Sequence, residues 1–163
     1  MLDIRVASEQ QRPIPERTLH LYLHDLSEFT GEEAGPKVRF DYDLLIRYKR
    51  EDGRYPRLFF SGEIPCEFAL IRSMSSDDQA KHVYQMAEFF VMRAYRRTGI
   101  GERAACLLFD AFPGELCVAQ EKENTGATTF WRRVIEYYTG GRFEEGRSGP
   151  PEGPTQIFRS PSV

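Results

Sequence analysis

Two arginines and two glycines stand together in a short turn of this chain, and their types and spacing suit the binding of a phosphate group. The turn reads Arg96-Arg97-Thr98-Gly99-Ile100-Gly101. Glycine lets a ligand approach the backbone closely, and arginine supplies charge and hydrogen-bond donors. An apolar run typical of a strand precedes the turn, and apolar residues at helical spacing follow it. The first amides of a helix lack partners within the helix, so the turn predicts an anion site at a helix N-terminus.

The same residues also fit a plain basic turn that leads into a surface helix, because short motifs have a high false-positive rate. A second feature lies just before the turn. Glu88 is the only charged residue in the apolar run from Val83 to Met92. A lone carboxylate in such a strand is either a solvent-facing residue at a sheet edge or part of a site. The sequence leaves both interpretations open.

The composition excludes several classes of protein. The chain has 163 residues, which suits one domain, residues 1–163, with a sizeable core. A formal net charge of −3 creates no overall field that attracts nucleic acid or an anionic membrane. The N-terminus has no signal-peptide pattern, and no run of about eighteen apolar residues occurs. Three cysteines without a CxxC pair predict neither a disulfide framework nor a zinc site. We expect a cytoplasmic protein without metal, nucleic-acid or membrane partners, and a homodimer is among the oligomeric states left open.

Apolar periodicity predicts helices and strands that alternate along the chain. Apolar residues recur at helical spacing in the segments 16–30, 100–112 and 124–138, and a short helix is expected at 42–49. Strands are expected at 2–6, 57–61, 66–71, 83–92, 116–120, 142–145 and 155–159. The second and third of these strands form an antiparallel hairpin. The strands 83–92 and 116–120 flank one helix, so we expect them to lie parallel.

Two motifs at these positions resemble the GNAT superfamily of acyl-CoA-dependent N-acetyltransferases. The turn fits its Q/R-x-x-G-x-G/A signature, and the pattern Asn124…Ala127…Phe130-Trp131 fits its N-x-x-A-x-x-[FL]-[YW] segment. The similarity covers nearly the whole chain and is clearest from Tyr84 to Phe143. Within the superfamily, the chain resembles a group of bacterial predicted acetyltransferases of undefined substrate. The resemblance implies an α+β fold in three layers, with a mixed, mostly antiparallel sheet of about six to seven strands and one parallel pair that splays apart.

The resemblance also implies acetyl-CoA as co-substrate and assigns roles to the matching residues. The strand residues Phe89, Phe90 and Val91 would offer backbone to the pantetheine arm. The pyrophosphate would be wrapped by Arg96, Arg97, Thr98, Gly99, Ile100, Gly101 and Glu102. Asn124 would reach the pantetheine or the thioester, beside a wall made of Ala127, Phe130 and Trp131. A primary amine of a small molecule or peptide would attack the thioester in a ternary complex, where strands 83–92 and 116–120 part.

The usual acid and base of that superfamily are missing. Ala119 stands where several members carry a glutamate base, and Trp131 stands where many carry a tyrosine acid. Glu88 is therefore the expected base, directly or through a water molecule. Tyr138 is the expected acid, with Tyr137 as a weaker candidate.

Two other classes of protein remain open. A non-catalytic acyl-CoA-binding or regulatory domain fits the missing acid and base, because a fold does not guarantee activity. The residues from Gly99 to Ala104 also match the G-x-G-x-x-A pattern of dinucleotide-binding oxidoreductases. The preceding antiparallel hairpin and the single crossover unit argue against that second class.

Overall fold

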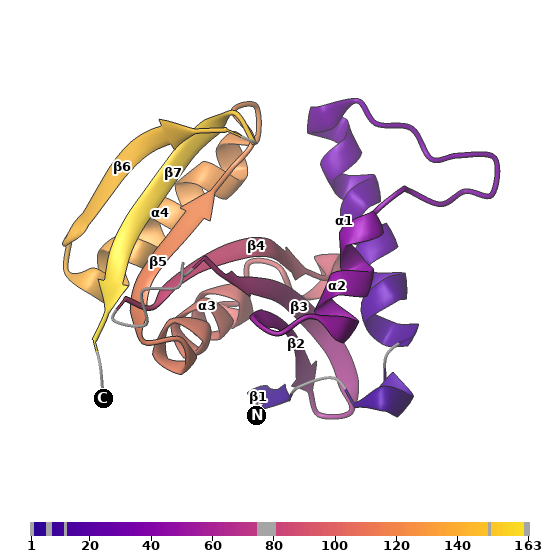
Figure 1. Ribbon diagram of the computed structural model, residues 1–163, viewed down its shortest axis with the longest axis horizontal. Coiled ribbons are helices and arrows are strands. Elements are labelled where there is room, and N and C mark those ends of the chain that lie inside the picture. The colour runs from indigo at the N-terminus through magenta and orange to yellow at the C-terminus, as the bar shows by residue number, and fades with distance from the viewer. Residues whose placement is uncertain (1, 6–7, 12, 75–80, 150, 162–163) are drawn as a thin grey trace.

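The computed structural model describes residues 2–5, 8–11, 13–74, 81–149 and 151–161. In this part of the chain seven strands form one mixed sheet in the order β1-β2-β3-β4-β5-β7-β6 (Figure 1). The strands are β1 (Leu2–Arg5), β2 (Arg54–Ser61), β3 (Ile64–Ser73), β4 (Val83–Val91), β5 (Gly114–Ala119), β6 (Phe143–Ser148) and β7 (Gly153–Ser160). The helices are α1 (Pro13–Thr30), α2 (Arg47–Arg50), α3 (Ile100–Ala111) and α4 (Thr125–Thr139). Short 3-10 turns are η1 (Glu9–Gln11), η2 (Asp43–Ile46) and η3 (Arg93–Tyr95). The predicted α+β architecture is confirmed.

Helices cover both faces of the sheet, because the strands alternate apolar residues between two cores. On one face, Leu19 and Leu23 of α1 pack with Tyr48 of α2 against Phe68 and Leu70 of β3. The other face packs against α3 and α4 through a second cluster, which includes Ala69, Ile71, Leu108, Phe109, Trp131, Val134 and Ile135. The alternation along β3 therefore produces three layers with the sheet in the middle (Figure 1).

Helix α1 begins at Pro13, three residues before the predicted start. Proline is tolerated in the first turn of a helix, where its missing N–H has no partner to lose. The hairpin strands are also longer than predicted. The strand pairing continues to the charged residues Arg54 and Arg72, which lie opposite each other in the register of β2 and β3. Among the described helices, none combines the length and the apolar character needed to cross a bilayer.

Strands β4 and β5 are the parallel neighbours in the described sheet, and they stay together over a short distance. Their register runs from Val83↔Glu115 to Met86↔Val118. Beyond Met86, β4 remains paired with β3 while β5 remains paired with β7, so the two strands splay apart (Figure 1). The β3–β4 register shifts after Leu70, which leaves Ala87 as a bulge where the splay begins. The sheet therefore consists of two parts, β1–β4 and β5–β7, joined by a short seam.

Gly114 closes the seam at the end opposite the splay. The backbone N–H of Glu115 donates to the carbonyl oxygen of His82 at 2.9 Å. Gly114 has a φ of +141°, and a Cβ at this position would collide with that same carbonyl oxygen. Only glycine allows β5 to approach the start of β4 this closely.

Glu67 of β3 is a carboxyl group inside the core. Its exposed fraction is 0%, and neither side-chain oxygen has a hydrogen-bond partner among the described residues. Burial raises the pKa of this carboxyl well above its ordinary value. The folded state therefore keeps the proton over a pH range in which the unfolded chain has lost it. The resulting contribution to stability is complete below the unfolded pKa of about 4.3 and is lost as the pH rises toward the folded pKa.

We predict that Glu67→Met raises the free energy of unfolding at pH 8 by about 1–3 kcal/mol, because it removes an unpaired buried polar group at similar side-chain length. Urea denaturation at pH 4 and pH 8 measures this difference, and the gain should be smaller at pH 4. Glu67→Gln is the control, because it removes the titration but keeps unpaired polar atoms. A gain for Glu67→Met that is the same at both pH values would contradict the prediction.

Candidate functional site

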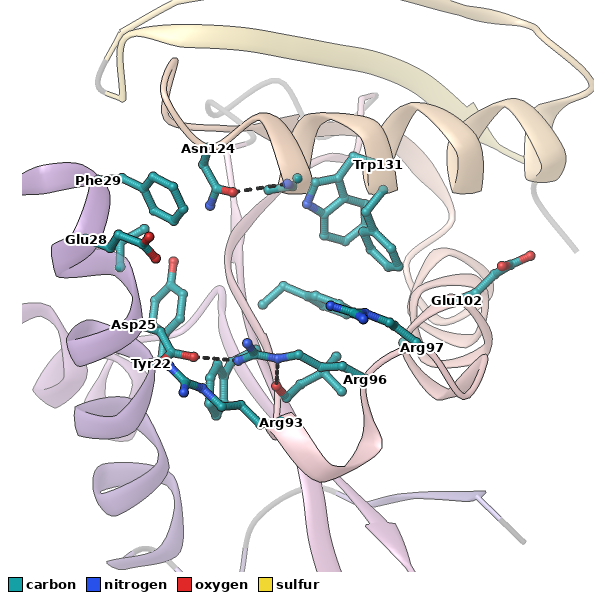
Figure 2. Close-up of a pocket in the computed structure, with 18 of the residues that line it drawn as sticks. Tyr22, Asp25, Glu28, Phe29, Arg93, Arg96, Arg97, Glu102, Asn124 and Trp131 are labelled. Carbon is teal, nitrogen blue, oxygen red and sulfur yellow. Dashed lines mark hydrogen bonds and ion pairs between the residues drawn. The ribbon is translucent and has the colours of Figure 1, made fainter.

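A cavity of about 890 Å³ lies between α1, the end of β4, the start of α3 and the start of α4 (Figure 2). Most of the residues expected to bind the co-substrate line it. These are Phe89, Phe90, Val91, Arg96, Arg97, Gly99, Gly101, Glu102, Asn124, Ala127, Phe130 and Trp131. Two expected residues are not among its lining. The Thr98 hydroxyl donates to the carbonyl of Tyr95 at 2.6 Å, and Ile100 packs against the core.

The turn before α3 leaves its backbone amides open toward the cavity. Gly99 is the N-cap with a left-handed φ of +84°, and no side chain caps the helix. A Cβ on Gly99 would meet no atom within 4 Å, so the space in front of the turn is open. A Cβ on Gly101 would lie 3.2 Å from Val91 Cγ2, so glycine keeps α3 close to β4. The free amides and the helix dipole at this turn suit the binding of an anion.

The arginines of the turn differ in their partners. Arg93 and Arg96 donate to the two carboxylate oxygens of Asp25 on α1 at 2.7 and 2.6 Å, and Arg96 Nε donates to Val91 O at 2.8 Å. Burial raises the pKa of Asp25, but the hydrogen bonds from Arg96 and Arg93 outweigh it and leave the pKa below its ordinary value. These contacts fasten α1 to the turn (Figure 2).

Arg97 is the available cation at this site. Its guanidinium has no hydrogen bond or ion pair to another described residue, and its side chain lines the cavity. Its φ of +61° is left-handed, which is unfavourable for a residue with a Cβ. Such backbone strain concentrates at ligand sites. The turn therefore combines open amides with one unpaired positive charge.

A smaller cavity of about 180 Å³ fills the gap where β4 and β5 separate. Its walls are the segments 85–89 of β4 and 118–121 at the end of β5. The two cavities are adjacent, because both are lined by Tyr22, Leu26, Phe89, Asn124, Ala127 and Trp131. A ligand at the α3 turn can therefore extend along β4 into the gap in the sheet.

Asn124 shapes the junction between the cavities. Its side-chain oxygen accepts a hydrogen bond from the backbone N–H of Ala127 at 3.1 Å, so Asn124 is the N-cap of α4. This contact begins α4 beside the gap and directs Trp131 into the cavity from the next turns (Figure 2). Trp131 packs edge-on against Phe89 with ring centroids 4.7 Å apart.

Glu88 lies in the small cavity rather than at a solvent-facing edge. The hydroxyl of Tyr42 donates to its Oε1 at 3.0 Å. Burial raises the pKa of Glu88, while hydrogen bonding from Tyr22 and Tyr42 opposes the increase and the charge of Glu121 adds to it. A partly desolvated carboxylate with a raised pKa suits a general base near neutral pH. Ala119 faces the same cavity and offers no carboxylate.

The structure does not bring Tyr138 to either cavity. Its hydroxyl donates to Asp110 Oδ1 at 2.7 Å and lies 3.0 Å from Ser160 Oγ, and its ring packs against Phe109. Tyr138 follows Trp131 by seven residues, which is about 10 Å along a helix. That distance carries it past the cavity, so the expectation of Tyr138 as the acid is not retained. Tyr137 is 75% exposed and lines neither cavity.

Several residues of the site were not predicted from the sequence, among them Tyr22, Asp25 and Tyr42. Tyr22 and Asp25 lie on α1, where their spacing indicated only a core face and a polar face. Tyr42 lies in the long segment between α1 and β2, and it contacts Glu88 across 46 positions of the chain. No local pattern reveals such pairs. In the described residues there is also no group of three or more His, Cys, Asp or Glu that could hold a metal ion.

Comparison with known proteins identifies the fold. No protein-family model and no curated protein matches this sequence. An acetyltransferase from Thermus thermophilus is 19% identical with a TM-score of 0.64, covering 98% of this chain and 97% of its own. An acetyltransferase of the GNAT family from Staphylococcus aureus is 11% identical with a TM-score of 0.61, covering 98% and 99%. The PaiA N-acetyltransferase from Thermoplasma acidophilum, solved with coenzyme A, is 10% identical with a TM-score of 0.64, covering 98% and 99%. The chain thus has the fold of the GNAT acetyltransferases.

Proposed function

We propose that this protein transfers an acetyl group from acetyl-CoA to a primary amine. The observation that carries the proposal is the continuity of the two cavities. The larger one begins at an anion site with open amides and Arg97, and the smaller one ends in a gap in the sheet beside Glu88. One cavity suits a long molecule with phosphates at one end, and the other suits a reacting group. The activity of the structural neighbours is consistent with this assignment.

The residues present fit CoA. The open amides of the α3 turn and Arg97 would hold the pyrophosphate. Past Met86, no strand in the described part of the chain pairs with β4 on the side of β5, so the backbone between Ala87 and Val91 can pair with the pantetheine amides. Arg96 Nε already uses the carbonyl oxygen of Val91. The aromatic wall of Phe130 and Trp131 would enclose the arm from the α4 side.

Acetyl-CoA supplies an activated acyl group as a thioester. The new C–N bond forms as the C–S bond breaks, and the amine proton must leave. Glu88 would take this proton, directly or through water, and the departing thiolate takes up one proton in turn. Fixing both reactants in adjacent cavities supplies much of the rate, and the base adds about 10²- to 10⁴-fold.

Ligand-dependent thermal unfolding tests the choice of co-substrate. A ligand at 100 times its dissociation constant stabilises the folded state by about 2.7 kcal/mol. Acetyl-CoA should therefore raise Tm clearly, and NAD at the same concentration should not. A rise with NAD alone would favour a dinucleotide-binding oxidoreductase. No rise with any acyl-CoA would exclude both the transferase and the acyl-CoA-binding module.

Arg97→Asn separates the charge of the turn from its backbone shape. Asparagine tolerates the left-handed conformation, so we expect unchanged stability. Loss of a charge-assisted hydrogen bond, worth about 1.5–3 kcal/mol, should weaken acetyl-CoA binding about 10- to 100-fold by calorimetry. Arg97→Lys keeps the charge and should lose less. Equal affinity for Arg97→Asn and the wild type would show that Arg97 does not contact the ligand.

A non-catalytic acyl-CoA-binding domain is the second candidate. One observation favours it: Ala119 and Trp131 occupy the expected catalytic positions, and Tyr138 lies outside the site. A screen of acetyl transfer to amino acids, polyamines, aminoglycosides and peptide N-termini separates the two functions. Transfer to any amine above the rate of hydrolysis supports the enzyme, whereas acetyl-CoA binding with hydrolysis alone supports the binding module.

A further inference from the structure

The two cavities carry opposite charges. The larger one is lined by four arginines, at positions 93, 96, 97 and 133, and by three carboxylates, Asp25, Glu28 and Glu102, so its lining has a formal charge of +1 and Arg97 is its cation without an ion pair among the described residues. The smaller one is lined by two carboxylates, Glu88 and Glu121, and by no Lys, Arg or His among the described residues. An anionic co-substrate in the first cavity would thus lie beside a site that favours a cation. The electrostatic field across the junction orients two substrates of opposite charge.

Glu121 lies two residues beyond the end of β5, at the partly exposed mouth of the gap, which Leu26 of α1 also lines. Burial raises the pKa of its carboxyl, and the charges of Glu123 and Glu32 raise it further. Glu32 lies just beyond α1, and Glu123 lies in the turn before α4. The C-terminal end of α1 adds the negative pole of a helix dipole. Negative charge from three segments therefore converges on Glu121.

The cations of this region are engaged or turned outward. The charge of Arg72 lowers the pKa of Tyr42, so this arginine is near the gap. Its guanidinium is already engaged, because Nε donates to Oε1 of Gln85 in the wall of the gap at 2.5 Å. Lys122 is exposed, and no positive charge is among the causes that shift the pKa of Glu121 or Glu88. Among the described residues, the small cavity therefore has one carboxylate, Glu88, beside the expected position of the reacting amine, and a second, Glu121, with no cation in the same lining.

We propose that the acceptor is a linear amine with at least two positive charges. This inference rests on the proposed acetyl transfer and specifies its substrate class. One nitrogen reacts beside Glu88 in the gap, and a second ammonium group binds Glu121 at the mouth, with Glu32 and Glu123 close by. The small cavity of about 180 Å³ admits a slim unbranched chain. The second charge distinguishes this acceptor from a peptide N-terminus or a simple monoamine.

The test compares 1,4-diaminobutane with 4-amino-1-butanol, which has the same chain length and reacting amine but a hydroxyl in place of the second ammonium. We expect kcat/KM to be at least about tenfold higher for the diamine at low salt, with the ratio falling as sodium chloride screens the charges. Glu121→Gln should reduce this preference about tenfold. Glu63→Gln, on the exposed β2–β3 turn, removes a charge outside the site and should leave the preference unchanged.

Calorimetry of each amine with the CoA-saturated protein provides a readout that does not depend on turnover. Diamine binding that weakens in Glu121→Gln, without acetyl transfer, would uphold the assignment of the cation site and refute the proposed transferase. Equal kcat/KM for the two amines would overturn the inference and leave acetyl transfer standing. The inference also fails if the diamine neither binds nor reacts, or if Glu121→Gln retains the full preference.

Discussion

Replacing Gly99 with glutamate is expected to lower the affinity for acetyl-CoA by about 10²- to 10³-fold. Gly99 is the N-cap of α3, and the space around its missing Cβ is open. A carboxylate there would face the pyrophosphate in front of the helix amides. Two like charges about 4 Å apart near a protein surface repel by about 4 kcal/mol, which corresponds to roughly a thousandfold in affinity. Isothermal calorimetry measures the loss.

Gly62→Glu is the matched control for this variant. Gly62 in the β2–β3 turn has a φ of +63° and also has no atom within 4 Å of its missing Cβ. Both variants place a glutamate in a left-handed conformation, so both should lose about 1–2 kcal/mol of stability. Only Gly99→Glu should lose acetyl-CoA binding. Full affinity in Gly99→Glu would place the pyrophosphate elsewhere.

Glu88→Gln is expected to lower kcat/KM for acetyl transfer by about 10²- to 10⁴-fold, which is the usual contribution of a general base. The affinity for acetyl-CoA should stay the same, because Glu88 lines the small cavity and not the large one. A base works only when deprotonated, and burial raises the pKa of Glu88. The wild-type rate should therefore rise with pH through that raised pKa, and the variant should lack this limb.

Tyr42→Phe tests the assignment of Glu88 as the base by removing the hydroxyl that donates a hydrogen bond to its carboxylate. The Tyr42 hydroxyl donates to Glu88 Oε1, and this hydrogen bond lowers the pKa of the carboxyl. Removing the hydroxyl should raise that pKa and move the acidic limb of the pH–rate profile toward higher pH. If Tyr42→Phe leaves the limb in place while Glu88→Gln removes it, Glu88 is the base and the contact with Tyr42 does not tune it. An unchanged profile in Glu88→Gln would remove Glu88 from the mechanism.

Local patterns predicted most of the fold. Hydrophobic periodicity identified three of the four α-helices within a few residues of their bounds. The short helix expected at 42–49 is present as the 3-10 turn η2 followed directly by α2. Two beta-prone runs joined by a short turn predicted the antiparallel hairpin β2–β3, one of five antiparallel pairs in the described sheet. The helix between β4 and β5 required a parallel pair. Each of these inferences uses contacts between residues close in sequence.

Only the part of the site that is formed by one continuous segment of the chain could be predicted from the sequence. The α3 turn is a continuous segment, so its glycines and arginines could be read directly. The contacts of Glu88 with Tyr42, and of Arg96 with Asp25, join residues 46 and 71 positions apart. Helical spacing also placed Tyr138 on the face of Trp131, but spacing does not show where a cavity ends along a helix. Long-range packing decides these questions, and one sequence contains no direct record of it.

The short seam between β4 and β5 has a consequence for hydrogen exchange. Four residue pairs, from Val83↔Glu115 to Met86↔Val118, hold the two parts of the sheet together. The large cavity takes its walls from both parts, with Val91 on one side and Asn124 on the other. A bound ligand is thus a cross-link between them, and it acts against opening at the seam. The amides of residues 83–86 should exchange more slowly with solvent when acetyl-CoA is bound, although they lie outside the large cavity.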